Sequence, residues 1–285
     1  MNAQIFPQQF VGRERAIALH CSGAGAGQWR CLGEMLGRSY ELLTPEHYGS
    51  ESSGPWTGEH EFTLADEAAR SIALIDEHEN NVHLVGHSYG GAVALNIALN
   101  RPDRISSMTL YEPSAFHLLR QMGEAGAKAF SEISAVARHL GQCVINGDYH
   151  AGVADFVEYW SNLGSWKAMH PAVQNALMRW APKGPLDFHA LFRDATPADA
   201  YGALRFPVLI MRGEHAPLPT RVISERLLEL LPRCQLKIVA GAGHMGPLTH
   251  QRKVSEIISE HIAAARGEHR INSQMPQLAG EFMLV

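Results

Sequence analysis

The sequence has no long apolar run, few cysteines and no block of like charge. No stretch of its 285 residues is apolar over the length that a bilayer span needs. Residues 1–15 lack the basic and apolar regions of a signal peptide, so we expect no secretory leader. The four cysteines form no CxxC pair and are too few and too spread for a disulfide framework. This pattern favours reduced thiols in a cytoplasmic protein.

Positive charge is also scarce, because 24 Lys and Arg stand against 29 Asp and Glu, for a formal net charge of -5. A nucleic-acid-binding surface needs clustered positive charge, which argues against a nucleic acid partner. The 16 histidines do not fall at metal-ligand spacing. We therefore expect no metal, no cofactor and no membrane contact, and a small-molecule substrate as the partner. The oligomeric state is open, with a homodimer among the options.

Short apolar runs alternate with helical patterns along most of the chain. Strands are predicted at residues 15–20, 40–43, 82–86, 105–111, 207–211 and 235–239. Helices are predicted at residues 28–36, 64–78, 90–99, 222–231 and 254–265. Such alternation predicts an α/β fold, in which a mainly parallel sheet is covered by helices on both faces.

Residues 114–200 interrupt this alternation, because they carry helical patterns and few strand signals. Several large aromatic residues are concentrated there: Tyr159, Trp160, Trp166, Trp180 and Phe188. We therefore predict an α/β core formed by residues 1–113 and 201–285, with residues 114–200 as a helical insertion on the sheet.

A G-x-S-x-G motif occupies residues 86–90, with Ser88 at its centre. Its glycines permit a sharp turn that exposes the serine hydroxyl at the carboxyl end of a strand. Five residues alone are a weak signal, but a predicted strand precedes this motif and a predicted helix follows it. We therefore predict that Ser88 is a nucleophile.

A glycine-rich segment, residues 241–247, follows the last predicted strand and contains His244. The ordinary pKa of an imidazole suits a general base at neutral pH. The chain order of serine first and histidine last, with an acid expected between them, matches one known arrangement of a catalytic triad. We therefore predict that His244 is the general base.

An oxyanion hole needs N–H groups that point at the oxygen of a tetrahedral intermediate. The residue after the nucleophile, Tyr89, is expected to supply one of them. The loop of small residues after the first strand is expected to supply the other, from Ser22 or, less favoured, from Cys21. A dinucleotide-binding loop is disfavoured, because Gln28 stands where its third glycine would be.

Four segments occur in an order that resembles the α/β-hydrolase superfamily: LHCSGAGAGQW, VGHSYGG, VLIMRGEHAPLPT and GAGHMGPLT. The resemblance covers residues 13–112 and 203–265 and is to the serine-nucleophile branch. It implies the α/β-hydrolase fold, a helical cap formed by residues 114–200, and ester-like or related acyl chemistry. It names no substrate.

The chain departs from this family at the triad acid. Family members usually carry an aspartate in a GExD motif, but the segment here ends in Ala216. Glu112, at the end of the strand after the nucleophile helix, is the favoured replacement, and Glu214 is the alternative acid. A third explanation is a dyad, an impaired enzyme or a binding protein, since alanine does not orient an imidazole.

The expected function is hydrolysis of a small to medium, largely apolar ester through an acyl-enzyme on Ser88. The alternatives are cleavage of a carbon–carbon bond in a diketone, or ligand binding on a hydrolase scaffold. The residues predicted to bind substrate are His20, Cys21, Met245, Trp160 and Trp166.

Overall fold

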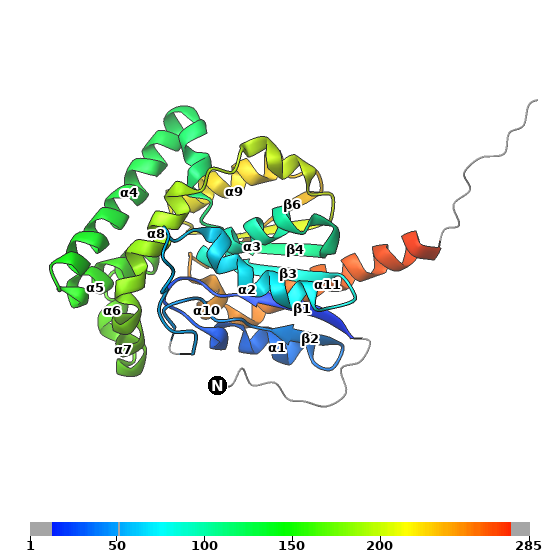
Figure 1. Ribbon diagram of the computed structural model, residues 1–285, viewed down its shortest axis with the longest axis horizontal. Coiled ribbons are helices and arrows are strands. Elements are labelled where there is room, and N and C mark those ends of the chain that lie inside the picture. The colour runs from blue at the N-terminus through cyan, green and yellow to red at the C-terminus, as the bar shows by residue number, and fades with distance from the viewer. Residues whose placement is uncertain (1–12, 51, 275–285) are drawn as a thin grey trace, which may run out of the picture.

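The structure, a computed structural model, describes residues 13–50 and 52–274 (Figure 1). The expectation about a secretory leader rests largely on residues 1–12, which lie outside this part of the chain. Six described strands form one sheet: β1 (Glu14–Leu19), β2 (Tyr40–Leu43), β3 (Val82–His87), β4 (Ile105–Tyr111), β5 (Val208–Gly213) and β6 (Cys234–Val239). Their order is β2-β1-β3-β4-β5-β6, and every neighbouring pair is parallel.

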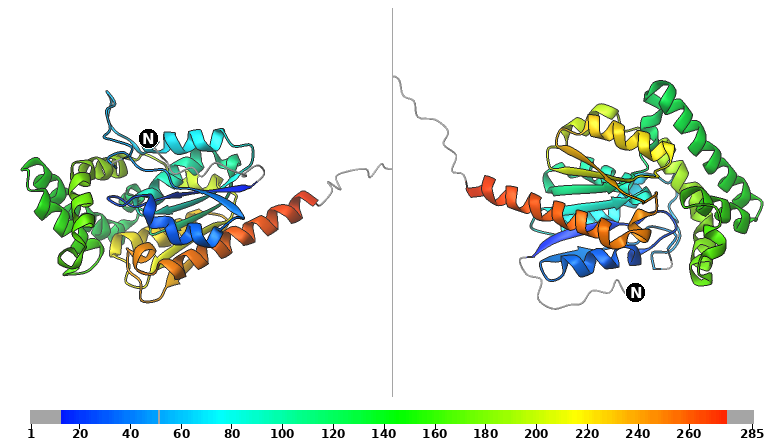
Figure 2. Two further views of the ribbon diagram at one scale, coloured as in Figure 1. Left: turned by 90° about the horizontal axis from the view of Figure 1, so that it is seen from below. Right: turned by 180° about the vertical axis from the view of Figure 1, so that it is seen from behind.

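Helices cover both faces of this sheet (Figure 2). One face carries α1 (Arg30–Leu36) and α11 (Gln251–Gln274), and the other carries α2 (Leu64–Asp76), α3 (Tyr89–Asn100) and α9 (Leu218–Leu230). Successive residues of β1 alternate between the two cores: Ile17 and Leu19 belong to one, and Ala16 and Ala18 belong to the other. Both faces are therefore apolar, as a parallel sheet between helix layers requires.

The described chain between β4 and β5 contains helices and no strand. They are η3 (Phe116–Gln121), α4 (Gly123–Ile145), α5 (Tyr149–Trp160), α6 (Ser165–Ala168), α7 (Pro171–Trp180), η4 (Ala181–Lys183), α8 (Gly184–Arg193) and η5 (Ala198–Ala203). Helices α4 to α8 gather at one end of the sheet (Figure 1). We call residues 114–200 the helical insertion. The division of the chain into a core and a separate cap stays a prediction.

The predicted α/β fold is confirmed, with small shifts at the element ends. The predicted helix at residues 222–231 begins earlier, at Leu218, and the last helix extends from Gln251 to Gln274. Within the described residues, no helix combines the length and the apolar character that crossing a membrane would require.

Candidate active site

The turn between β3 and α3 holds Ser88 in a left-handed conformation, with φ 55° and ψ -117°. A side chain at Gly86 would place its Cβ 2.5 Å from the carbonyl oxygen of Gly90. A side chain at Gly90 would lie 2.5 Å from the carbonyl oxygen of His20. The two glycines are therefore what allows this tight turn, which presents the hydroxyl of Ser88 beyond the carboxyl end of β3.

A continuous chain of hydrogen bonds joins Ser88, His244 and Glu112. Nε2 of His244 lies 2.9 Å from Oγ of Ser88, and Nδ1 lies 2.7 Å from Oε2 of Glu112. All three side chains are buried, and Glu112 has 0% exposure. The structure thus brings together the serine, the histidine and the favoured carboxylate of the sequence analysis.

Glu112 is held by more than the imidazole. The N–H of Gly213 donates to its Oε1 at 2.8 Å, and the hydroxyl of Thr220 donates to its Oε2 at 2.7 Å. A buried carboxylate needs such partners, because burial removes the water that would otherwise solvate it. Its backbone φ of 43° is also left-handed, immediately after β4 ends.

Glu214, the alternative acid, faces away from the imidazole. Its side chain is exposed, and its Oε2 accepts a hydrogen bond from the N–H of Gly241 at 2.8 Å. In the structure Glu214 therefore binds the backbone of the loop that carries His244, and the carboxylate hydrogen-bonded to the imidazole is that of Glu112.

Two hydrogen bonds fix the backbone of the loop that carries His244. The hydroxyl of Tyr111 donates to the carbonyl of Gly243 at 2.8 Å, and Nε2 of His87 lies 2.9 Å from the carbonyl oxygen of His244. Burial, together with the nearby His244, holds the pKa of His87 well below its ordinary value. A neutral His87 donates through Nε2 and positions the loop without placing a second charge beside His244.

The predicted oxyanion donors belong to two residues that line the same cavity as Ser88. Tyr89 is the first residue of α3, where a backbone N–H has no acceptor within the helix, and Ser22 lies on the loop after β1. Both residues line the cavity beside Ser88. The N–H of the less favoured donor, Cys21, already has an acceptor, because it donates to Oε1 of Gln28 at 3.2 Å.

The cavity beside Ser88 has walls that are largely aromatic. Its lining consists of Ser22, Ser88, Tyr89, Ser114, Phe116, Phe156, Trp160, Trp180, Gly184, Asp187, Phe188 and Leu191. Most of these residues belong to the helical insertion. Pockets of this kind, apolar with a few polar groups, are typical of small-molecule sites.

Of the five residues predicted to bind substrate, Trp160 lines this cavity. Its ring centroid lies 4.1 Å from that of His244, with the ring planes 33° apart. Trp166 points elsewhere, since its indole N–H donates to His150 at 3.2 Å. Trp166 is not among the residues that line this cavity, because helical periodicity does not reveal which face of an insertion meets the site, and its role in substrate binding stays a prediction.

His20, Cys21 and Met245 are not among the residues that line this cavity, and their role in substrate binding stays a prediction. Nδ1 of His20 lies 2.8 Å from the carbonyl oxygen of Cys21, and the thiol of Cys21 is buried, which raises its pKa to about 12. Met245 packs against the larger hydrophobic core. These residues are close in sequence to the reacting groups, but that closeness does not determine whether their side chains point into the cavity.

Sequence reasoning missed Ser114 and Asp187. Oγ of Ser114 lies 3.2 Å from Oγ of Ser88, and Asp187 places a buried carboxylate in the cavity wall. The available signal for Asp187 was its spacing of four residues from Lys183, with which it forms an ion pair. That spacing does not show whether such a pair is buried.

A parallel sheet with a serine on the strand-to-helix turn and a histidine after the last strand defines an α/β hydrolase. The chain belongs to the alpha/beta hydrolase family, whose sequence profile matches residues 16–257. It is accordingly an enzyme of the hydrolase class.

Among its relatives is a 2-(acetamidomethylene)succinate hydrolase of Mesorhizobium japonicum, 29% identical over 202 residues, which are 68% of this chain and 67% of the relative. A 2-hydroxy-6-oxo-6-phenylhexa-2,4-dienoate hydrolase of Burkholderia cepacia is 30% identical over 128 residues, 43% of this chain and 45% of the relative.

Solved structures of similar fold include an esterase of Thermogutta terrifontis, with a TM-score of 0.68 and 17% identity over 88% of this chain and 90% of the esterase. A carboxylesterase of Bacillus subtilis has a TM-score of 0.67 and 19% identity, over 89% of this chain and 85% of that protein. At these identities the likeness concerns the fold.

Proposed function

We propose that the chain is a serine hydrolase that cleaves a small to medium, largely apolar ester through an acyl-enzyme on Ser88. The observation that carries this proposal is the buried line of hydrogen bonds from Glu112 through His244 to Ser88. That line gives a serine hydroxyl both a base within reach and a carboxylate that orients the base.

In the acylation step, Nε2 of His244 takes the proton of Ser88 as its Oγ attacks the ester carbonyl. Glu112 accepts the hydrogen bond from Nδ1–H and stabilises the imidazolium that forms. The N–H groups of Ser22 and Tyr89 bind the oxyanion of the tetrahedral intermediate. His244 then gives its proton to the departing alcohol, which leaves the acyl group on Ser88.

Deacylation repeats these steps with water in place of the serine. His244 removes a proton from a water molecule, which attacks the acyl carbonyl, and the same N–H donors hold the second oxyanion. His244 finally returns the proton to Oγ of Ser88, so that the free acid leaves and the enzyme is restored.

The cavity walls support a neutral substrate. Among the described lining residues, the charged side chain is the carboxylate of Asp187, and neither lysine nor arginine is present. A substrate carboxylate would find no free counter-ion there, because Lys183 already pairs with Asp187 and Glu67. This charge pattern favours an ester over the carboxylate-bearing compounds that appear in the relatives' names.

Cleavage of a carbon–carbon bond is the second candidate, supported by the relative named as a 2-hydroxy-6-oxo-6-phenylhexa-2,4-dienoate hydrolase. The hypothesis of ligand binding without catalysis rested on the missing acid at Ala216. Glu112 lies beside His244 instead, so this reason for the hypothesis no longer applies. A cytoplasmic location, a small-molecule partner and the oligomeric state stay predictions.

The test compares the native enzyme with Ser88→Ala on p-nitrophenyl esters of short and medium acyl chains and on a 2-hydroxy-6-oxo-dienoate. We expect ester turnover by the native enzyme and background rates with Ser88→Ala. Equal rates for the two proteins on every substrate would overturn the proposed function. Turnover that depends on Ser88 and is confined to the dienoate would replace ester hydrolysis with carbon–carbon bond cleavage.

A further inference from the structure

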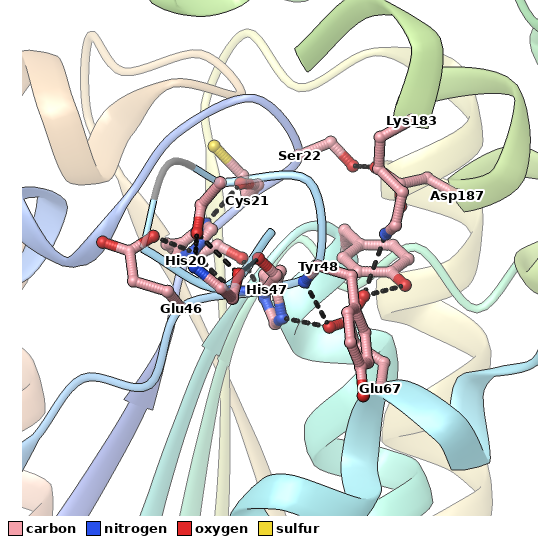
Figure 3. Close-up of polar contacts among 12 residues, drawn as sticks. His20, Cys21, Ser22, Glu46, His47, Tyr48, Glu67, Lys183 and Asp187 are labelled. Carbon is pink, nitrogen blue, oxygen red and sulfur yellow. Dashed lines mark hydrogen bonds and ion pairs between the residues drawn. The ribbon is translucent and has the colours of Figure 1, made fainter. Parts of the chain in front are cut away.

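The side chains of Ser22 and Tyr89 end in the same buried ionic cluster. Figure 3 shows Ser22 beside the three charged members of this cluster, Glu67, Lys183 and Asp187. The hydroxyl of Tyr89 donates to Oε2 of Glu67 at 2.9 Å, and the hydroxyl of Ser22 donates to Oδ2 of Asp187 at 2.8 Å. Lys183 joins these two carboxylates, because its ammonium lies 2.9 Å from Oε2 of Glu67 and also pairs with Oδ1 of Asp187. We call Glu67, Lys183 and Asp187 the bridge cluster.

The members of the bridge cluster come from both parts of the chain. Glu67 lies on α2 of the predicted core, whereas Lys183 ends η4 and Asp187 lies on α8, both in the helical insertion. Their exposed fractions are 3%, 5% and 3%, respectively. Taking three charges out of water is unfavourable, so a cluster this deeply buried needs an explanation beyond its contribution to stability.

The charges within the cluster compensate one another. Burial alone would lower the pKa of Lys183, but Asp187 and Glu67 outweigh burial and raise it, so the ammonium stays protonated. Burial alone would raise the pKa of Glu67, but His47 and Lys183 hold it well below its usual range. Lys183 is therefore a cation between two carboxylates.

Further hydrogen-bond donors of the protein satisfy the remaining oxygen atoms of the Glu67 and Asp187 carboxylates. The N–H of Tyr48 donates to Oε1 of Glu67 at 2.9 Å, and the indole N–H of Trp180 donates to Oδ2 of Asp187 at 3.1 Å. Each carboxylate oxygen thus has a partner within the protein. The cluster is accordingly a closed network that holds other groups in place, rather than a site that awaits a ligand.

We infer that Lys183 is a positioning residue of the oxyanion hole, holding Ser22 and Tyr89 at a fixed separation through Asp187 and Glu67 so that their backbone N–H groups converge on one oxygen. This inference rests on the proposed function. Oxyanion donors stabilise the transition state only when they are already oriented before charge develops. A link between their side chains supplies that orientation, because it fixes two segments of chain that are far apart in sequence.

The first experiment replaces Lys183 with methionine, which keeps the length of the side chain and removes its charge. Lys183→Met should lower kcat by about 10- to 100-fold on a p-nitrophenyl ester, somewhat less than the loss of a whole donor, while KM changes little. The matched control is Lys167→Met, an exposed lysine of the same insertion, which should keep native kinetics. An unchanged kcat in folded Lys183→Met would overturn the inference.

A trifluoromethyl ketone separates positioning from general disruption. Its tetrahedral adduct with Ser88 uses the oxyanion donors, whereas the alcohol product, bound as a competitive inhibitor, does not. Affinity for the ketone should fall in Lys183→Met in parallel with kcat/KM, and affinity for the alcohol should stay native. Equal losses for both ligands would mean that the cluster only shapes the cavity, and would overturn the inference.

Two milder variants keep the inference testable if Lys183→Met does not fold. Tyr89→Phe removes only the link to Glu67, and Ser22→Ala removes only the link to Asp187, while all three charges and both backbone N–H groups remain. Each should lower kcat by about 3- to 10-fold with little change in KM, as partial loss of one donor predicts. Native kcat in both variants would overturn the inference.

Ser88→Ala distinguishes failure of the proposed function from failure of the inference about Lys183. If the native enzyme shows no turnover that depends on Ser88, the proposed function is wrong and the inference falls with it. If native turnover depends on Ser88 but kcat is indifferent to the bridge cluster, the proposed function stands and the role of Lys183 alone is wrong.

Discussion

Glu112 combines an unfavourable backbone conformation with complete hydrogen bonding. Few residues other than glycine adopt its φ of 43°, yet its carboxylate receives bonds from Gly213, Thr220 and His244. Strain of this kind persists where the surrounding structure fixes the residue, and it concentrates at functional sites. The geometry is that expected of a carboxylate whose task is to orient an imidazole.

The first prediction concerns this carboxylate. Glu112→Gln should lower kcat by roughly 10²- to 10⁴-fold, because an amide does not stabilise the imidazolium and can select the wrong tautomer. Steady-state kinetics on a p-nitrophenyl ester measure the effect. Glu214→Gln is the matched control and should keep kcat within about twofold, since surface changes away from the reacting groups have small effects. The reverse ranking of the two variants would contradict the assignment.

Glu112 could be predicted from the sequence, whereas Asp187 could not. Ala216 removes the usual acid, and Glu112 ends the strand that follows the nucleophile helix, so the chain order pointed to it. Nothing in the local sequence shows that Asp187 points into the cavity, because that direction depends on how α8 packs against the sheet.

At the scale of elements, the turn from β3 into α3 depends on the absence of side chains at its glycines. Adding one methyl group at Gly90 would bring it against the backbone at the end of β1, including the carbonyl oxygens of Leu19 and His20. A backbone neighbour gives way less easily than the end of a flexible side chain. The spacing of β1 and α3 is therefore set by this glycine.

The second prediction compares two identical substitutions. Gly90→Ala should reduce the free energy of unfolding by about 1–3 kcal/mol through overpacking. Gly141→Ala, inside α4 with no atom within 4 Å of the added Cβ, should increase it by about 0.5–1 kcal/mol through helix propensity. Urea unfolding curves measure both, and a stabilised Gly90→Ala would contradict the packing argument.

The elements themselves were largely predictable, because alternating apolar runs and helical patterns are local properties. The walls of the cavity were not, as two tryptophans of the insertion show. Trp160 ends α5 and lies over His244, whereas Trp166 on α6 faces His150. Both have aromatic rings in helical segments, so the sequence pattern does not separate them.

At the scale of the whole molecule, the helical insertion and the sheet layers meet at buried charge as well as at apolar surface. Lys183 of the insertion pairs with Glu67 of α2 at 2.9 Å. Because the folded environment holds the pKa of Glu67 below its unfolded value, folding favours the ionised form. The resulting stability is complete above the unfolded pKa of about 4.3 and is lost as the pH falls toward the folded value.

The third prediction follows from the loss of this stability at low pH. The melting temperature of the native enzyme should fall between about pH 5 and pH 3, and Glu67→Gln should show a smaller fall over the same range, though it starts lower at neutral pH. Calorimetry on both proteins measures the difference. Equal slopes would contradict the low pKa of Glu67, and Asp103→Asn, a change on the exposed η2 turn, is the control.

The fourth prediction concerns charge in the substrate. A neutral p-nitrophenyl hexanoate should have a kcat/KM at least about 10-fold higher than the p-nitrophenyl monoester of adipic acid, which carries a terminal carboxylate. The expected cause is the cost of removing water from the carboxylate in a largely apolar cavity that offers no free cation. A preference for the charged ester would contradict it and would favour the carboxylate-bearing substrates named for the relatives.

The origin of the bridge cluster limits how this enzyme can be recombined with its relatives. Glu67 belongs to the first half of the chain, and its cation Lys183 arrives with the insertion. A chimera that takes its insertion from another family member therefore inherits a buried carboxylate that has lost its lysine partner, unless the donor carries a cation at the same place. Such a chimera would have to exchange Glu67 together with the insertion. The exchanged residues would then come from two separate parts of the sequence, Glu67 on α2 and the insertion between β4 and β5.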